Sequence, residues 1–248
     1  MVLLRKIKEQ APLIHHITNQ VVINFVANGT LAVGGSPVMS HHAEEVEEMV
    51  SHAQALVINI GTLDPDLVEA AALAGKKANQ LNIPVVLDPV GVGATAFRRR
   101  AVTRLMDEVS FAVICGNRAE LSFLAKGNWE GKGVDAGSSP APVDWPFEAV
   151  MALTGETDYV NHVAITGGHP LLARVTGTGC LATSLIGLFL AVEQDAQKAA
   201  VHALSMLKLA GEMAGAKASG PGSFVPALLD ALYHITPEQL EKRVASLL

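Results

Sequence analysis

The stretch ALVINIGTLDPDLVEAAALAGKKANQLNIPVVLDPVG, residues 55–91, contains two short apolar runs separated by a long alanine-rich segment. The runs ALVINIG and PVVL consist mainly of Val, Ile and Leu, which is typical of strands that are buried on both faces of a parallel sheet. The segment between them is long enough for a helix, and its Asp-Pro start suits a helix N-terminus. The order strand, helix, strand predicts a βαβ unit.

The same alternation extends in both directions from this unit. Extended runs are predicted at LIHHIT (13–18), SPVMS (36–40), FAVICGN (111–117), AVMALTG (149–155), TDYV (157–160) and HVAITG (162–167). Helices are predicted at 1–13, 20–34, 42–54, 95–109 and 118–125, and the segment 127–146, rich in Gly, Pro, Ser and Asp, is predicted to be a loop. This rhythm predicts an α/β fold with a mostly parallel central sheet flanked by helices, in one domain over residues 1–248.

Composition limits the class of protein. Hydrophobic residues make up 50% of the 248 and charged residues 17%, so the chain can fill a large core. The longest apolar run, Leu181–Val192, is shorter than the ~20 residues that span a bilayer, and we expect a buried helix there. The N-terminal segment mixes charged and apolar residues and has no cleavage site of small residues, so we expect a cytoplasmic protein without a membrane anchor.

Charge and cysteine content exclude further classes. The net charge is -6, and the only basic cluster, Arg98-Arg99-Arg100, is expected to form a solvated helix face, so no nucleic-acid partner is predicted. Cys115 and Cys180 lack the CxxC spacing of a metal or redox site, and we expect both to be free thiols.

Polar residues follow several of the predicted strands at the point where each strand ends. Ligands of parallel sheets bind beyond the carboxyl ends of the strands, where Thr62, Asp88, Glu120 and Thr154 stand in this chain. Asp88 alone is most simply a helix cap. Together with Glu120, however, it could hold a hydrated magnesium ion between the two carboxylates and a phosphate chain.

RVTGTGCLATSLIGLFLAV, residues 174–192, places a glycine-rich turn before the predicted buried helix. The backbone N–H groups of Gly177, Thr178, Gly179 and Cys180 would then face an anion at the positive end of the helix dipole, while the threonines cap the helix. Cys180 at this position is expected to have a lowered pKa and to act as nucleophile or base. No GK[ST] follows, so this is not a Walker A loop, and the third glycine of a Rossmann fingerprint is missing. Glycines that merely allow close helix packing are the alternative.

Longer motifs resemble one family. They are HxITNxVVxNFxANGxLAxGxSPVM (15–39), ALVINIGTL (55–63), VVLDPVGVGAT (85–95), GNxAE (116–120), TGExDYV (154–160), GGHPLLxxVTGTGC (167–180) and GPGSF (220–224). In this order and at this length they are similar to hydroxyethylthiazole kinase, the thiamine-salvage member of the ribokinase-like kinases.

The resemblance implies a three-layer ribokinase-like fold and ATP-dependent phosphorylation of the hydroxyl of 4-methyl-5-(2-hydroxyethyl)thiazole, with Mg²⁺. It further implies a homotrimer with active sites between subunits, in which Asn19 and Met39 of one subunit face Cys180 of another. By position, Asn19 and Met39 would line the thiazole site, Gly177 would contact the substrate near its hydroxyl, and Thr154 would contact ATP. Asp88 and Glu120 would serve magnesium, and Cys180 stands where sugar kinases carry an aspartate base.

The chain departs from the family in one residue that bears on function. In the family, an arginine that contacts ATP precedes GNxxE. Cys115 stands at that position here, and Arg118 is not expected to replace the missing arginine. Cys115 therefore keeps one alternative to the kinase open, a thiazole-binding protein with impaired catalysis. A second alternative is an ATP-dependent dehydratase of the same fold, such as those that repair hydrated nicotinamide cofactors, although the ITN and SPVM segments speak against it.

Four histidines, His15, His16, His41 and His42, lie close together in the sequence. No carboxylate follows at a spacing that would complete a metal site. They are expected to be capping or surface residues, with one of them near the substrate.

Overall fold

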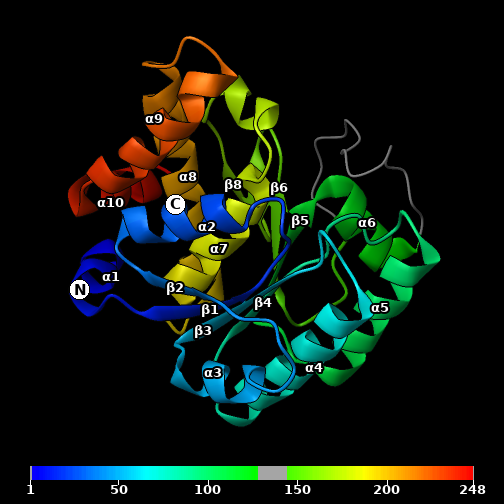
Figure 1. The fold of residues 1–248 in the computed structure, drawn as a ribbon. Helices are drawn as coiled ribbons and strands as arrows, with labels where there is room; N and C mark the ends of the chain where they lie inside the picture. Colours follow the sequence, from blue (N-terminus) through cyan, green and yellow to red (C-terminus); the bar gives the residue numbers. More distant parts are fainter. Residues whose placement is uncertain (1, 128–143, 248) are drawn as a thin grey trace.

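The computed structural model describes residues 2–127 and 144–247, in which one eight-stranded sheet carries helices on both faces (Figure 1). The strands are β1 Leu13–Ile17, β2 Ser36–Met39, β3 Ala55–Asn59, β4 Val85–Asp88, β5 Val113–Asn117, β6 Val150–Thr154, β7 Asp158–Val160 and β8 Val163–Ile165. Their order across the sheet is β2-β1-β3-β4-β5-β6-β7-β8. The predicted α/β class is confirmed.

Pairing within the sheet is parallel from β2 through β6 and antiparallel for the last two strands. The six parallel strands therefore end at the same edge of the sheet, and the loops that follow them meet there. The hairpin between β6 and β7 and the loop after β8 flank this edge at one side, and β2 is the outermost strand on the other.

The helices divide between the two faces and so make three layers. They are α1 Leu3–Gln10, α2 Ile23–Val33, α3 Val46–His52, α4 Pro65–Gln80, α5 Ala96–Glu108, α6 Arg118–Lys126, α7 Thr178–Leu190, α8 Ala196–Gly215, α9 Pro221–His234 and α10 Pro237–Ala245, with a 3₁₀ turn η1 at Pro170–Arg174. Helices α3 to α6 enclose one core against the sheet, and the remaining helices enclose the other. The predicted three-layer arrangement is thus confirmed.

Helix α7 packs directly against the centre of the sheet. Every residue from 181 to 190 is buried, and the helix contacts β3, β4 and β5. A Cβ at Gly187 would lie 2.5 Å from the Cγ2 of Val57, so glycine is required for this close approach. The expected buried helix is confirmed, and no helix in the described ranges has the length and apolar content to cross a membrane.

Several smaller predictions have different outcomes. Both cysteines are free, as expected. The loop predicted at 127–146 lies mostly outside the described residues. The expectation that His15 and His16 are surface or capping residues is wrong, because both lie in β1 and are at most 1% exposed. The His16 imidazole bonds to the Ser184 hydroxyl at 2.8 Å, and burial lowers its pKa to about 4.

Candidate active site

The carboxyl edge of the sheet brings together most of the polar residues that the sequence singles out. Asp88 ends β4, Glu120 lies in the first turn of α6 after the neighbouring strand β5, and Thr154 ends β6. Asn19 follows β1, and Cys180 lies in the first turn of α7. Strand topology therefore gathers side chains that are far apart in the sequence.

A chain of amide hydrogen bonds runs along this edge to Asp88. The Asn19 side-chain amide donates to Asn59 Oδ1 at 2.8 Å, and the Asn59 amide donates to Asp88 Oδ2 at 2.5 Å. The Thr183 hydroxyl, from α7, donates to the same carboxylate oxygen at 3.2 Å. All four side chains are buried. The carboxylate is therefore fixed in place from both the sheet and α7.

Glu120 is fixed by backbone donors. Its Oε1 accepts from the Gly91 amide and its Oε2 from the Asn117 amide, each at 2.8 Å. The second bond is half of a capping box, because the Asn117 side chain accepts from the Glu120 amide in return. Glu120 thus ties the start of α6 to the loop after β4, the loop that leaves Asp88.

Asp88 and Glu120 are both buried and lie close enough for their charges to interact. Burial, together with the charge of Glu120, raises the pKa of Asp88 well above its ordinary value. Burial also raises the pKa of Glu120 to about 7, against the lowering effect of its two backbone donors and of Arg98. Within the described residues neither carboxylate forms an ion pair with Lys or Arg. A cation bound between them would therefore relieve a standing repulsion.

The N-terminus of α7 points its first amides at this edge. Gly177 is the N-cap residue with a φ of 90°, and its carbonyl accepts the first intrahelical bond, from the Leu181 amide at 2.8 Å. The backbone amides of Thr178, Gly179 and Cys180 lie before this first bond and have no acceptor within the helix. The expected threonine caps are wrong: no side chain in the described parts of the chain caps α7, and Thr178 instead donates to the Leu172 carbonyl at 2.9 Å.

The two glycines of this turn have different reasons to be glycine. At Gly177 the positive φ disfavours any side chain, and a Cβ would lie 2.6 Å from Val22 Cγ1. At Gly179 the φ is ordinary, and a Cβ would meet nothing within 4 Å among the described atoms. Packing therefore explains Gly177 but gives no reason for a glycine at position 179.

Cys180 lies beside Asn19 in the same chain. The Asn19 amide nitrogen is 3.4 Å from the Cys180 sulfur, so the expectation that Asn19 reaches Cys180 from another subunit is wrong. The lowered pKa expected for this thiol is also wrong. Burial and the adjacent Asp88 carboxylate raise the pKa of Cys180 to about 12, because both effects outweigh a helix dipole worth ~1 kcal/mol or less. Cys180 is a neutral thiol at physiological pH.

Arg98 contradicts the expectation that the three consecutive arginines form only a solvated face. Its guanidinium donates to the carbonyls of Ile60 at 2.6 Å, Val90 at 2.7 Å and Gly61 at 2.5 Å. These carbonyls belong to the loops after β3 and β4. Arg98 therefore fastens together the two loops that lead away from Asn59 and Asp88.

The remaining expected residues lie further along the edge. Met39 ends the outermost strand β2 opposite His16, and Thr154 ends β6 opposite Asn117, both partly buried. Cys115, which stands where the family's arginine was expected, is fully buried in β5, and burial and the Asp88 carboxylate raise its pKa well above the ordinary value.

Sequence reasoning missed four polar residues around the site: Asn59, Asp158, Thr183 and Lys208. Each is at most 4% exposed. Asn59 interrupts the apolar run ALVINIG, and Lys208 is the single charge in SMLKLAG. A polar residue within an otherwise apolar element is the signal that could have found them, because such a group is buried only with partners.

Comparison with known proteins agrees with these features. The profile of the hydroxyethylthiazole kinase family matches residues 4–238. A hydroxyethylthiazole kinase of Moorella thermoacetica is 47% identical over 251 residues, covering 97% of this chain and 94% of the relative. One from Pasteurella multocida is 47% identical over 254 residues, covering 96% and 95%. The solved structure of the hydroxyethylthiazole kinase protein of Pyrococcus horikoshii superposes with a TM-score of 0.84 at 39% identity, covering 96% of this chain and 94% of that one.

Proposed function

The chain belongs to the hydroxyethylthiazole kinase family, and from that premise we propose that it transfers the γ-phosphoryl group of ATP to the hydroxyl of 4-methyl-5-(2-hydroxyethyl)thiazole, in thiamine salvage. The site on the carboxyl edge fits this reaction. It combines unbonded helix amides, buried carboxylates and amide side chains, which are the groups that phosphoryl transfer uses for positioning and charge stabilisation.

The observation that carries the proposal is Gly179. Glycine within a helix is less favourable than alanine by ~1 kcal/mol, and no atom of the described residues lies within 4 Å of a Cβ placed at Gly179. A glycine in that setting fits close approach of a phosphoryl group to the first amides of α7. We assign the backbone N–H groups of Thr178, Gly179 and Cys180 to the phosphoryl oxygens that gain charge in the transition state.

Asp88 and Glu120 fit a magnesium ion. Two buried carboxylates that form no ion pair with a described Lys or Arg favour a bound cation, and oxygen ligands are those that Mg²⁺ prefers. The described residues include no cluster of three or more His, Cys, Asp or Glu side chains that could enclose a metal by themselves. That suits an ion which keeps water ligands and binds phosphate. The ion would neutralise charge on the ATP phosphates.

The substrates are assigned to opposite sides of the α7 N-terminus. Asn19 and Met39 are proposed to contact the thiazole alcohol, with Gly177 near its hydroxyl, and Thr154 is proposed to contact ATP. The thioether of Met39 suits contact with an aromatic sulfur heterocycle. Cys180 is proposed to contact the alcohol as a neutral thiol, in view of its raised pKa.

The reaction balances without a thiolate base. The alcohol oxygen forms a bond to the γ-phosphorus, the bond from that phosphorus to the β–γ bridging oxygen breaks, and ADP carries away the electron pair. In a loose transition state the alcohol keeps its proton until late, and the proton then passes to an oxygen of the transferred phosphoryl group or to water, so a strong base adjacent to the hydroxyl is not required. Positioning by Asn19 and the α7 amides then provides most of the acceleration.

A coupled ADP-release assay with the thiazole alcohol and Mg-ATP tests the proposal, with mass spectrometry to detect the phosphate ester. We expect ADP release that depends on the alcohol and yields one ester per ADP. Calorimetric binding of the alcohol without turnover would instead support a binding protein. ADP and phosphate release with a hydrated nicotinamide cofactor, but not with the alcohol, would support the dehydratase.

We further propose that the chain assembles as a homotrimer with its active sites near the subunit boundaries. The support is two exposed apolar side chains in the segment after β1: Val21, in the turn that follows Asn19, is 67% exposed, and Leu31, near the end of α2, is 56% exposed. Exposed apolar side chains of this kind favour burial against another copy. Light scattering should give three times the mass of one chain, and an active monomer would contradict the proposal.

A further inference from the structure

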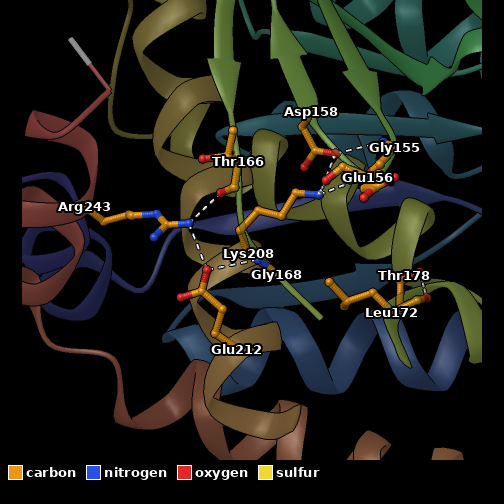
Figure 2. Close-up of polar contacts among 10 residues, drawn as sticks. All are labelled: Gly155, Glu156, Asp158, Thr166, Gly168, Leu172, Thr178, Lys208, Glu212 and Arg243. Atoms are coloured by element: carbon orange, nitrogen blue, oxygen red, sulfur yellow. Dashed lines mark hydrogen bonds and ion pairs between the residues drawn. The ribbon is translucent and has the colours of Figure 1, made fainter. Parts of the chain in front are cut away.

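A buried lysine lies behind the hairpin that follows Thr154. Lys208 is in α8, its side chain is 6% exposed, and its ammonium group has three close oxygen partners (Figure 2). It donates to the carbonyls of Gly155 at 2.8 Å and Glu156 at 2.9 Å, and pairs with Asp158 Oδ1 at 3.1 Å. An ammonium has three N–H donors, so this one is fully engaged. Lys208 is therefore not a free cation for a ligand.

Its partners define the conformation of the turn between β6 and β7. Asp158 Oδ1 accepts from the Gly155 amide at 2.8 Å as well as from Lys208. The turn is thus closed on itself by Asp158, and its two carbonyls are held toward α8 by the lysine. Thr154, the last residue of β6, directly precedes this turn. Any change in the turn acts first on Thr154 and Gly155.

Helix α8 also holds the neighbouring loop. One helical turn after Lys208, Glu212 accepts from the Gly168 amide at 3.0 Å and pairs with Arg243 at 2.9 Å. Arg243, from α10, donates in addition to the Thr166 carbonyl at 2.5 Å. Figure 2 shows the Lys208 and Glu212 side chains reaching these two loops from one helix.

The second loop continues to the start of α7. It enters η1, where the Leu172 carbonyl accepts from the Thr178 hydroxyl in the first turn of α7. The lysine stem lies against this loop, since a Cβ at Gly168 would be 2.8 Å from Lys208 Cδ. The lysine stem therefore packs beside this loop, whereas the ammonium group bonds within the turn at 155–158.

We propose that Lys208 is a positioning residue for the nucleotide: it fixes the turn at 155–158, and with it Thr154, where ATP binds, without contributing to the site of the alcohol. This rests on the proposed function and extends it. In the sheet β6 is four strands from β1, which leads to Asn19, a separation of about 19 Å at the usual strand spacing. A local change in the turn should therefore affect one substrate only.

The test is Lys208→Met, which keeps most of the length of the side chain and removes its charge. We expect the dissociation constant of Mg-ATP, measured by calorimetry, and its KM to rise about tenfold or more, as is usual for the loss of hydrogen bonds from a charged group. The KM of the thiazole alcohol should stay within about twofold. Lys198→Met is the matched control: Lys198 is in the same helix, and its side chain is 52% exposed where it pairs with Glu193.

A second variant separates positioning from stability. Lys208→Met with Asp158→Asn removes the buried carboxylate that the first variant leaves unpaired, and should recover thermal stability but not ATP affinity. An unchanged ATP constant in Lys208→Met would overturn the proposal, as would an equal rise in both KM values or full recovery of ATP affinity in the double variant. Calorimetry needs no turnover, so failure of the wild type to phosphorylate the alcohol would reject the proposed function and leave this test intact.

Discussion

Replacement of Gly179 tests whether the glycine-rich turn before α7 binds an anion or only allows close helix packing. A Cβ at this position meets no atom within 4 Å in the described structure, and the backbone φ needs no glycine. Gly179→Ala should therefore fold as well as the wild type. It should even gain up to ~1 kcal/mol from the better helix propensity of alanine, which raises Tm by roughly 2–4 °C in a chain of this size.

Activity should change in the opposite direction. A side chain at Gly179 stands in front of the first amides of α7 and keeps a phosphoryl group from reaching them. Loss of one such donor usually lowers kcat by ~10²–10³-fold, so Gly179→Val should reach this range. It should also be worse than Cys180→Ala, which leaves every amide in place and removes only a neutral thiol that is not required as a base.

Steady-state ADP release and a thermal melt on each variant provide the measurement. Gly177→Ala is the control, since a side chain there strains a φ of 90° and meets Val22, and it should lower Tm. A Gly179→Val enzyme with near-normal kcat would refute the anion-binding interpretation of the turn. A Gly179→Val enzyme that loses activity only in proportion to unfolding would refute it as well.

Three further predictions concern the buried ionisable groups. Asp88→Asn and Glu120→Gln should each raise the Mg²⁺ concentration needed for half-maximal activity at unchanged fold, and unchanged dependence in both would contradict their role. Cys180 should resist iodoacetamide at pH 8, because burial raises its pKa to about 12 and leaves little thiolate; rapid alkylation, read by mass spectrometry, would show the opposite. The ligand-free protein should become more stable as the pH falls from 8 to about 6.5, by urea unfolding. The folded-state pKa of Glu120, about 7, lies above the ordinary 4.5, so the folded state binds more protons in that range. Glu120 contributes on the order of 1 kcal/mol there, and a fall in stability over this range would contradict the burial of its charge. Below about pH 6.5 the buried His16, whose pKa is lowered to about 4, opposes any further gain.

The sequence predicted the layers and the edge of the sheet because these depend on local patterns. Apolar runs mark the strands, and the rule that parallel strands end together places Asp88 beside Glu120. The Asp-Pro pair likewise predicts the start of α4, where the Asp64 side chain accepts a hydrogen bond from the Leu67 amide.

What the sequence did not reveal depends on contacts between distant segments. Asn59 and Lys208 each read as a single polar residue in an apolar run, and their partners lie 29 and about 50 residues away. The pKa of Cys180 was predicted from its place in a helix alone. The actual shift has the other sign because the surrounding layers exclude water and bring Asp88 close.

One side of the site is held by a buried helix and the other by an edge strand, and this difference bears on how the substrate specificity of such an enzyme can change. The start of α7 continues into ten consecutive buried residues, whereas Met39 ends the outermost strand of the sheet. Mutation in the buried part of α7, residues 181–190, disturbs the core, whereas mutation at the end of β2 disturbs one edge. Since Met39 is proposed to contact the alcohol, a lineage could exchange its acceptor by small steps at β2 and keep its phosphoryl-transfer residues unaltered.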